Sequence, residues 1–285
     1  MLELMLRTVL FVPGNRPGML QKIVTLAADA FILDLEDSVP LSEKEAARRM
    51  VREAIGRHGA ADRGALCVRV NALPSGLTNG DLDAVVAPGL EGVWYPKAET
   101  VDEVQAVDGL LSHAEALMGL PAGHLDMIVG IESVRGLQNA PQIATASPRL
   151  AALAFGGEDF ATDLGIQRTR AGLELDHARA HVALAARSAG LEVLDSVCIH
   201  LEDDEQLAAE CQTARQMGYT GKAAIHPRQL ETITRVFSPS QGQVAYARRV
   251  VAAFEAVQAA GSAAIAVDGQ MMDIAALERY RRLLS

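Results

Sequence analysis

Eight short apolar runs, each separated from the next by a segment with helical periodicity, constrain the fold of this chain more than any other feature. Each run is bounded by Gly, Pro or charged residues, and such continuous apolar runs are typical of parallel strands buried on both faces. The runs fall at residues 8–12, 30–35, 66–70, 92–95, 127–131, 151–155, 193–198 and 223–225. Eight strand-and-helix units predict a closed (β/α)8 TIM barrel over residues 1–240, with an open doubly wound sheet as the alternative.

Residues 241–285 follow the eighth unit and predict a C-terminal helical extension. A helical stretch at 244–259 precedes a Gly-Ser joint at 260–262 and two acids, Asp268 and Asp273. A flexible joint ahead of an apolar segment and an acid suits a lid that closes over a substrate. In the alternative interpretation, Asp268 begins an ordinary Asp-Gly turn and Asp273 caps a helix.

Composition excludes several classes of function. A chain of 285 residues that is 49% hydrophobic can bury a large core, and its net charge of -10 argues against nucleic-acid binding. No stretch approaches the roughly 18 apolar residues that a membrane span needs, and the N-terminus lacks the basic region of a signal peptide. We therefore expect a cytoplasmic protein that binds neither nucleic acid nor membranes, with Cys67, Cys198 and Cys211 reduced and buried.

Acidic residues follow two neighbouring strands of the predicted barrel. Glu132 comes directly after the fifth strand, and Asp159 comes after the sixth, beside Gly156 and Gly157. A barrel brings the carboxyl ends of its strands into one ring, which is where such enzymes place their chemistry. Two carboxylates there suit a hard divalent cation, and exposed backbone N–H groups suit an anionic substrate. The alternative is that both acids merely cap helices.

A basic residue inside the third strand completes this candidate site. The guanidinium of Arg69 is always charged and forked, so it suits a carboxylate or an enolate oxygen. Its alternative role is a buried ion pair with Glu36 or Asp37, which we expect to hold metal-bound water or Arg69. Lys97 either pairs with these acids or meets the ligand; a Schiff-base role is disfavoured because the site already suits Mg²⁺.

An ordered series of motifs, from about Arg7 to the C-terminus, resembles the citrate lyase beta-subunit-like branch of the HpcH/HpaI aldolase superfamily, which includes malyl-CoA and citramalyl-CoA lyases. The motifs are Leu10-Phe11-Val12-Pro13-Gly14, Asp34-Leu35-Glu36-Asp37-Ser38-Val39, Val68-Arg69-Val70-Asn71, Pro96-Lys97, Ile131-Glu132-Ser133, Phe155-Gly156-Gly157-Glu158-Asp159-Phe160, Asp163-Leu164-Gly165, Gly221-Lys222-Ala223-Ala224-Ile225-His226-Pro227 and Asp268-Gly269-Gln270-Met271-Met272-Asp273. An ordered series is far more specific than any one motif.

The resemblance implies a modified TIM barrel that uses Mg²⁺ to cleave or form a carbon–carbon bond between a 2-oxo acid and a thioester. It implies Glu132 and Asp159 as the Mg²⁺ ligands and Arg69 as a catalytic and substrate-binding residue. The substrate-binding positions would also include Gly156, Gly157 and Glu158. Glycines at the start of a helix allow a carboxylate to approach backbone N–H groups closely.

The resemblance also concerns assembly and the thioester carrier. It implies Asp273, with Asp268 in reserve, as an acid/base supplied by a neighbouring subunit, and hence a homo-oligomer, most simply a trimer. It implies Arg16 and Lys22 as contacts to coenzyme A phosphates, whereas the plainer interpretation makes them a solvated helix start.

Three functions remain open on the sequence. The first is a lyase acting on a malyl-, citramalyl- or citryl-type CoA thioester, and the second is the beta subunit of an assembled citrate lyase whose thioester sits on an acyl carrier protein. The third is a thioesterase or a 2-oxo-acid-binding protein without lyase activity. The family pattern at Glu132, Asp159 and Arg69 weakens the last.

Overall fold

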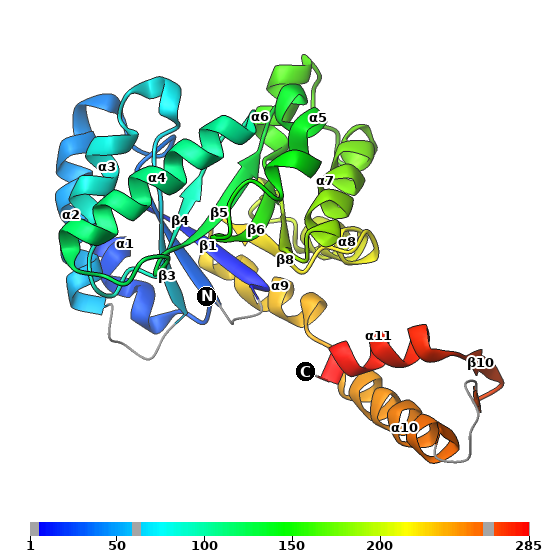
Figure 1. Cartoon of the computed structure of the whole chain (residues 1–285). Helices are drawn as coiled ribbons and strands as arrows, with labels where there is room; N and C mark the ends of the chain where they lie inside the picture. Colours follow the sequence, from blue (N-terminus) through cyan, green and yellow to red (C-terminus); the bar gives the residue numbers. More distant parts are fainter. Residues whose placement is uncertain (1–5, 59–63, 259–264, 285) are drawn as a thin grey trace. The chain divides into compact units, whose positions relative to one another are not determined.

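The chain forms a closed barrel of eight parallel strands surrounded by helices (Figure 1). The computed structural model describes residues 6–58, 64–258 and 265–284. The strands are β1 (Thr8–Pro13), β2 (Ala30–Asp34), β3 (Ala65–Arg69), β4 (Gly92–Tyr95), β5 (Asp126–Ile131), β6 (Leu150–Phe155), β7 (Glu192–Asp195) and β8 (Gly221–Ala224). Because β1 pairs with both β2 and β8, the sheet closes on itself. The TIM barrel prediction is confirmed, and the open-sheet alternative is wrong.

Helices follow the strands and cover the outside of the barrel (Figure 1). They are α1 (Pro17–Lys22), α2 (Lys44–His58), α3 (Thr78–Val85), α4 (Val101–Met118), α5 (Val134–Ile143), α6 (Gly157–Leu164), α7 (Asp176–Ser188), α8 (Asp204–Gln216) and α9 (Leu230–Phe237). Short 3-10 helices occur at η1 (Ile23–Thr25), η2 (Leu41–Glu43), η3 (Leu73–Ser75), η4 (Leu173–Leu175) and η5 (Pro227–Gln229). The strands lie close to their predicted positions, although β7 ends at Asp195 rather than at residue 198.

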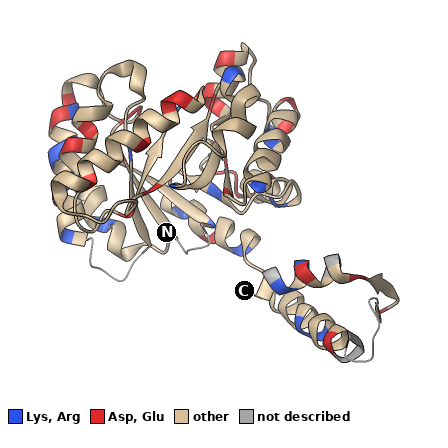
Figure 2. Cartoon of the chain, in the orientation of Figure 1, with Lys and Arg blue, Asp and Glu red and all other residues tan. Residues whose placement is uncertain are grey.

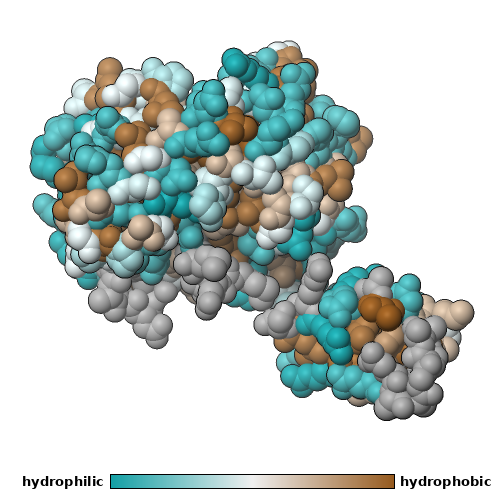
Figure 3. Space-filling view, in the orientation of Figure 1, coloured by the Kyte–Doolittle hydropathy of each residue, from teal (hydrophilic) through white to brown (hydrophobic). Residues whose placement is uncertain are grey.

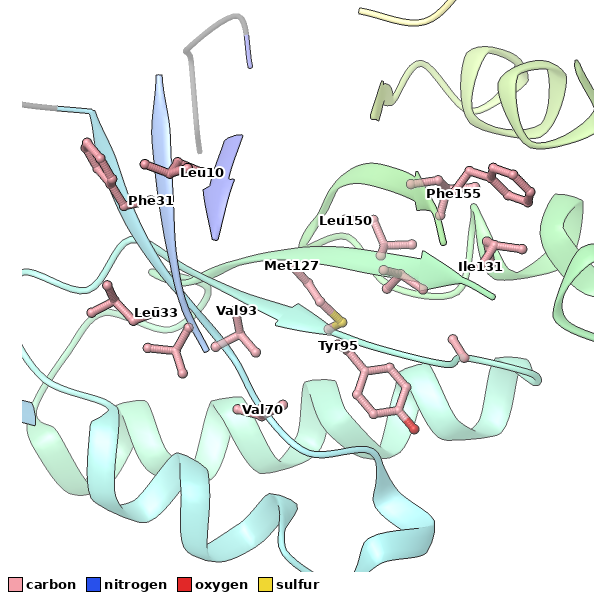
Figure 4. Close-up of a cluster of buried hydrophobic side chains, with 14 of the residues drawn as sticks. Leu10, Phe31, Leu33, Val70, Val93, Tyr95, Met127, Ile131, Leu150 and Phe155 are labelled. Atoms are coloured by element: carbon pink, nitrogen blue, oxygen red, sulfur yellow. The ribbon is translucent and has the colours of Figure 1, made fainter. Parts of the chain in front are cut away.

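Alternation along each strand sorts the apolar side chains into two cores. On β2, for example, Phe31 and Leu33 point outward, whereas Ala30 and Ile32 point into the barrel. The outward side chains form the large core between strands and helices, part of which is drawn in Figure 4. The inward side chains form a smaller core, which gives the barrel a filled interior beneath its open end.

The chain divides after Phe237 into two compact units, the barrel and a C-terminal unit that begins at Ser238. The C-terminal unit contains α10 (Gln241–Gln258), the antiparallel strands β9 (Ile265–Val267) and β10 (Gln270–Met272), and α11 (Ile274–Leu284). Its own apolar cluster includes Val250, Phe254, Ile265, Met272 and Leu277. The predicted Gly-Ser joint at 260–262 lies outside the described residues.

Both signs of charge are distributed over the outer helices (Figure 2). On the face shown in Figure 3, hydrophobic residues are scattered among hydrophilic ones. All three cysteines are buried. Among the described helices, none is long and apolar enough to cross a membrane.

A buried network of charges ties β7 and β8 to the helices outside them. Lys222 and Asp195 are each 1% exposed and form an ion pair of 2.7 Å, and Arg179 of α7 also pairs with Asp195 at 3.0 Å. Glu210 of α8 lies 3.0 Å from Lys222. A cavity of about 390 Å³ adjoins this network. Because Lys222 and Asp195 have neighbours of opposite charge, each charge is compensated despite its burial.

We predict that Asp195→Asn destabilises the barrel by about 3 kcal/mol, because it leaves the buried charges of Lys222 and Arg179 with less compensation. The free energy of unfolding would be measured by urea denaturation followed by circular dichroism. The matched control is Glu45→Gln, whose carboxylate is exposed and which should leave the midpoint unchanged. Equal midpoints for Asp195→Asn and the parent would contradict a stabilising role for the network.

Candidate metal and substrate site

A cavity of about 320 Å³ opens at the carboxyl ends of the barrel strands. Inward-facing residues of several strands, together with the start of α6, form its wall. The lining residues are Phe11, Pro13, Asp34, Ser38, Arg69, Trp94, Glu132, Phe155, Gly156, Gly157, Glu158, Asp159, Ser196, Val197, Ala223 and Ile225. The structure therefore brings the predicted residues Arg69, Glu132 and Asp159 to one cavity.

Arg69 points into the barrel from the end of β3, opposite Asp34 of β2 in the strand register. Asp34 accepts two hydrogen bonds from it, from Nε at 2.6 Å and from Nη2 at 2.7 Å. Burial alone would raise the pKa of Asp34, but the bonds from Arg69 outweigh that effect and hold the pKa below its usual range. The expected partners lie farther away, Glu36 at 2.9 Å and Asp37 at 3.7 Å from Nη1.

Lys97 joins this acidic cluster rather than standing alone. Its Nζ lies 2.6 Å from Glu36, 3.0 Å from Asp37 and 3.9 Å from Asp159. Desolvation would lower the pKa of Lys97, but the Glu36 and Asp37 carboxylates raise it instead. A lysine held as an ammonium ion is a poor nucleophile, which agrees with the sequence argument against a Schiff base.

The side chain of Glu132 is deeply buried in the cavity wall. Glu132 is 5% exposed, and among the acids of the wall only Asp34, at 1%, is less exposed. Burial, together with the nearby charges of Glu36 and Asp159, raises its pKa to about 8. Two glycines give its side chain room: a Cβ on Gly156 would stand 2.5 Å from Glu132 Cγ, and a Cβ on Gly130 would meet Glu132 Oε1. The backbone N–H of Lys97, which has a left-handed φ of 52°, donates to Glu132 Oε1 at 3.3 Å.

Neither acid caps a helix through its side chain. The N-cap of α5 is Ser133, whose hydroxyl accepts from the Gly136 N–H, and the N-cap of α6 is Gly156. Asp159 lies in the first turn of α6 with its side chain 45% exposed. Side-chain capping by Glu132 or Asp159 is therefore not observed, although Asp159 does lie at a helix start, and both carboxylates border the cavity.

The residues present fit a magnesium ion. Glu132 and Asp159 supply the hard oxygen donors that Mg²⁺ prefers, and a bound cation would offset the charge repulsion that raises the pKa of Glu132. Within the described part of the chain, no group of three or more His, Cys, Asp or Glu side chains is arranged to hold a metal. Mg²⁺ usually takes one or two carboxylates and completes its octahedron with water and substrate, so two acids suffice.

The two glycines after β6 lack a Cβ that would collide with neighbouring side chains, and their N–H groups are already hydrogen-bonded within the protein. The Gly156 N–H donates to the Ile131 carbonyl at 3.0 Å, and the Gly157 N–H donates to the Ser196 hydroxyl at 2.9 Å. These N–H groups, which the sequence assigned to a substrate carboxylate, already have partners. The Glu158 and Asp159 N–H groups lie in the first turn of α6, where a helix supplies no acceptor of its own. The Glu158 carboxylate contacts Arg168.

Arg16 and Lys22 of the barrel unit are not among the residues that line the cavity. Arg16 and Lys22 are exposed at the beginning and end of α1. Asp268 and Asp273 belong to the C-terminal unit, where Asp268 and Gly269 form the turn between β9 and β10 with left-handed φ angles of 51° and 79°. Asp273 directly precedes α11, and its carbonyl accepts the Leu277 N–H.

Several wall residues were missed in the sequence. Asp34, Phe11 and Trp94 all occupy inward positions on strands, and Ser196 follows the inward Leu194 of β7 by two residues. Counting every second residue back from Glu36, along β2, would have found Asp34. The same period applied to β1 and β4 would have found the two aromatic residues.

Comparisons with known proteins show what this chain is similar to. A family model described as HpcH/HpaI aldolase/citrate lyase matches residues 7–227. Citrate lyase subunit beta of Leuconostoc mesenteroides subsp. cremoris is 37% identical over 99% of this chain and 93% of its own length. A (3S)-malyl-CoA thioesterase of Cereibacter sphaeroides is 35% identical over 94% of this chain and 89% of its own length.

A solved structure supports the same relationship. The CitE protein of Mycobacterium tuberculosis, crystallised in complex with magnesium, acetoacetate and coenzyme A, superimposes with a TM-score of 0.77 at 31% identity. The match covers 98% of this chain and 96% of that one. The similarity therefore includes the C-terminal unit as well as the barrel.

The raised pKa of Glu132 predicts a pH-dependent stability of the metal-free protein. Because its folded-state pKa of about 8 lies above that of an unfolded carboxyl, its contribution is full at low pH and is lost as pH rises through about 8. We expect Glu132→Gln to remove this loss, and to abolish the rise in melting temperature that Mg²⁺ gives the parent. Melting curves on either side of that pH provide the measurement.

The control for this prediction is Glu158→Gln, whose half-exposed carboxylate lies in the same wall and should leave the pH dependence intact. A Glu132→Gln protein that still loses stability through the same pH range would show that another group titrates there.

Proposed function

Because the chain belongs to the HpcH/HpaI aldolase/citrate lyase family, we propose that it is a Mg²⁺-dependent carbon–carbon lyase. Its substrate would be a 3-hydroxy-3-carboxyacyl thioester of the malyl-, citramalyl- or citryl-CoA type. Cleavage would give a 2-oxo acid and an acyl-CoA, and the reverse reaction would be a condensation. The observation that carries the proposal is that Glu132, Asp159 and Arg69 border one cavity.

The chemistry is a retro-Claisen cleavage. The hydroxyl proton of the substrate passes to a base, and the bond between the hydroxyl-bearing carbon and the carbon next to the thioester breaks. Its electron pair forms the thioester enolate, which is then protonated on carbon. Glu132 and Asp159 would hold Mg²⁺, which would supply a Lewis acid for the substrate hydroxyl oxygen and offset the charge of the two acids.

Arg69 is the cation placed to stabilise developing negative charge. Asp34 fixes its fork by accepting one hydrogen bond from Nε and one from Nη2, while Nη1 lies 2.9 Å from Glu36 in an ion pair. Nη1 and Nη2 therefore retain N–H groups beyond the two that Asp34 accepts. An oriented guanidinium costs no reorganisation when the enolate oxygen forms. Two further carboxylates hold this arrangement, those of Glu36 and Asp37. Each lies near Nη1 of Arg69 and also pairs with the ammonium of Lys97.

The acid/base is proposed to be Asp273, supplied by the C-terminal unit of an adjacent subunit in a homo-oligomer, most simply a trimer. Its place directly before α11 and after β10 puts a carboxylate at a defined point of a small folded unit. The division of the chain after Phe237 supports a C-terminal unit that acts as a separate lid.

The carrier of the thioester is proposed to be coenzyme A, with Arg16 and Lys22 contacting its phosphates as exposed cations on α1. An acyl carrier protein is the alternative carrier, and the chain would then be the beta subunit of an assembled citrate lyase, as the name of a 37% identical relative suggests. A thioesterase is the second candidate activity, because a relative with 35% identity is named (3S)-malyl-CoA thioesterase.

An assay of the full-length protein with Mg²⁺ against malyl-, citramalyl- and citryl-CoA tests the proposal. We expect release of a 2-oxo acid together with an intact acyl-CoA, and we expect Asp159→Asn to reduce the rate at least about 100-fold, since it removes a charged ligand while keeping shape. Release of free coenzyme A without a 2-oxo acid would instead favour the thioesterase. An Asp159→Asn protein with parental rate and Mg²⁺ affinity would refute the metal assignment.

Mixing two inactive variants tests the shared site. Truncation after Gly261 removes Asp273, and Arg69→Ala disables the cavity, so each alone should show little turnover. Mixed oligomers should regain activity because an intact cavity then lies beside an intact C-terminal unit. The control is a mixture of the truncated chain with a truncated Arg69→Ala chain, which should stay inactive. Full activity of the truncated protein alone would rule out a catalytic role for Asp273.

A further inference from the structure

The cavity described above has one charged side and one aromatic side. Phe11 of β1 lies under the guanidinium of Arg69, with the Arg69 Cζ 4.8 Å from its ring centroid. Trp94 of β4 packs edge-on against Phe11, with 5.0 Å between ring centroids. Both rings line the cavity, so a ligand held by Arg69 meets an aromatic floor.

The charges of the wall are unequal. Among the described residues that line the cavity, four are carboxylates, Asp34, Glu132, Glu158 and Asp159, and Arg69 is the one cation. Asp34 and Glu36 already hold much of that guanidinium. Outside the wall, Arg168 pairs with Glu158, and the ammonium of Lys97 is held by Glu36 and Asp37 and lies 3.9 Å from Asp159. With Asp34 paired to Arg69, one bound Mg²⁺ would offset only the charges of Glu132 and Asp159, so the wall has no cation left for a second carboxylate.

The rest of the wall is apolar. Phe155, Val197, Ala223 and Ile225 add to the two aromatic rings. A carboxylate placed against such side chains would lose its hydration without gaining a partner, which costs free energy. A ligand with a methyl group or a hydrogen atom at the same place has no charged group there, so it does not bear this cost of lost hydration.

We infer that the cavity selects a short monocarboxylic 2-oxo acid, such as glyoxylate or pyruvate, over dicarboxylic oxaloacetate, and that Trp94 sets the limit on size. The inference rests on the proposed function, since it concerns the same site. It assigns the chain to malyl- or citramalyl-type thioesters rather than to citryl-type ones.

Trp94 is suited to this limiting role by its position in the barrel interior. It lies opposite Arg69 in the register of β3 and β4 and is 5% exposed. It belongs to the interior core, in which the small residues Ala30, Ala152 and Ala154 take up little space. Its Nε1 makes no hydrogen bond to the described residues, so packing alone holds the ring. A smaller residue would therefore enlarge the cavity without leaving a polar group unsatisfied.

Calorimetric binding to the full-length protein with Mg²⁺ tests the role of charge. Oxaloacetate and 2-oxobutyrate have the same number of carbons and differ in the distal carboxylate. We expect 2-oxobutyrate to bind at least about tenfold more tightly, a difference of about 1.4 kcal/mol. Tighter binding of oxaloacetate would overturn the inference while leaving a lyase acting on citryl thioesters. Mg²⁺-dependent binding of none of these acids would overturn the proposed function as well.

A variant that adds a positive charge to the cavity tests whether the lack of a second cation limits the binding of oxaloacetate. Ile225 lines the cavity and is 41% exposed, so Ile225→Lys introduces an ammonium at the margin without burying it. We expect oxaloacetate affinity to rise severalfold and 2-oxobutyrate affinity to stay the same. Ile225→Met is the uncharged control. Equal affinities for oxaloacetate in the two variants would overturn the charge argument.

The size limit is tested with pyruvate and 2-oxovalerate. The parent should prefer pyruvate, Trp94→Leu should reduce that preference at least about fivefold, and Trp94→Phe should fall between them because the cavity grows in steps. Circular dichroism confirms that each variant is folded, and Trp94→Phe keeps the test decisive if Trp94→Leu does not fold. An unchanged preference in a folded variant would overturn the role of Trp94.

Discussion

Hydrogen bonding between β1 and β8 is the constraint on which the rest of the barrel depends. The pairing of Thr8 to Leu10 with Lys222 to Ala224 removes both edges of the sheet and makes every strand interior. Closure also forces alternate residues into a confined space. That is why side chains as distant in sequence as Phe11 and Ile225 border one cavity, and why the acids that follow different strands repel one another.

Ion pairs stabilise Asp34 and Glu36 at the acidic end of the barrel, whereas Glu132 has no such pair among the described residues. Asp34 has Arg69, and Glu36 has both Arg69 and Lys97. Glu132, in contrast, accepts a single weak bond from a backbone N–H, and its pKa is raised by burial and by like charges. Because a metal ligand must be deprotonated, a cation bound at Glu132 would release its proton and lower its pKa.

The strands could be predicted because buried parallel strands form continuous apolar runs with clear boundaries. An ion pair of Arg69 with Glu36 could also be predicted, but its hydrogen-bonded partner Asp34 could not, because only the register of β2 with β3 places Asp34 opposite Arg69. The partners of the Gly156 and Gly157 N–H groups could not be predicted for a similar reason. Their N–H groups meet Ile131 and Ser196 through contacts that no local pattern contains.

The placement of Trp94 has an optical consequence. It is the only tryptophan among 285 residues, and it lies in the wall of the cavity beside Phe11 and in register with Arg69. Light absorbed by indole therefore probes this cavity and no other part of the molecule. Its emission would respond to a ligand, to a cation at the neighbouring acids or to entry of water. The protein thus contains a spectroscopic reporter at the place where its chemistry is proposed to occur.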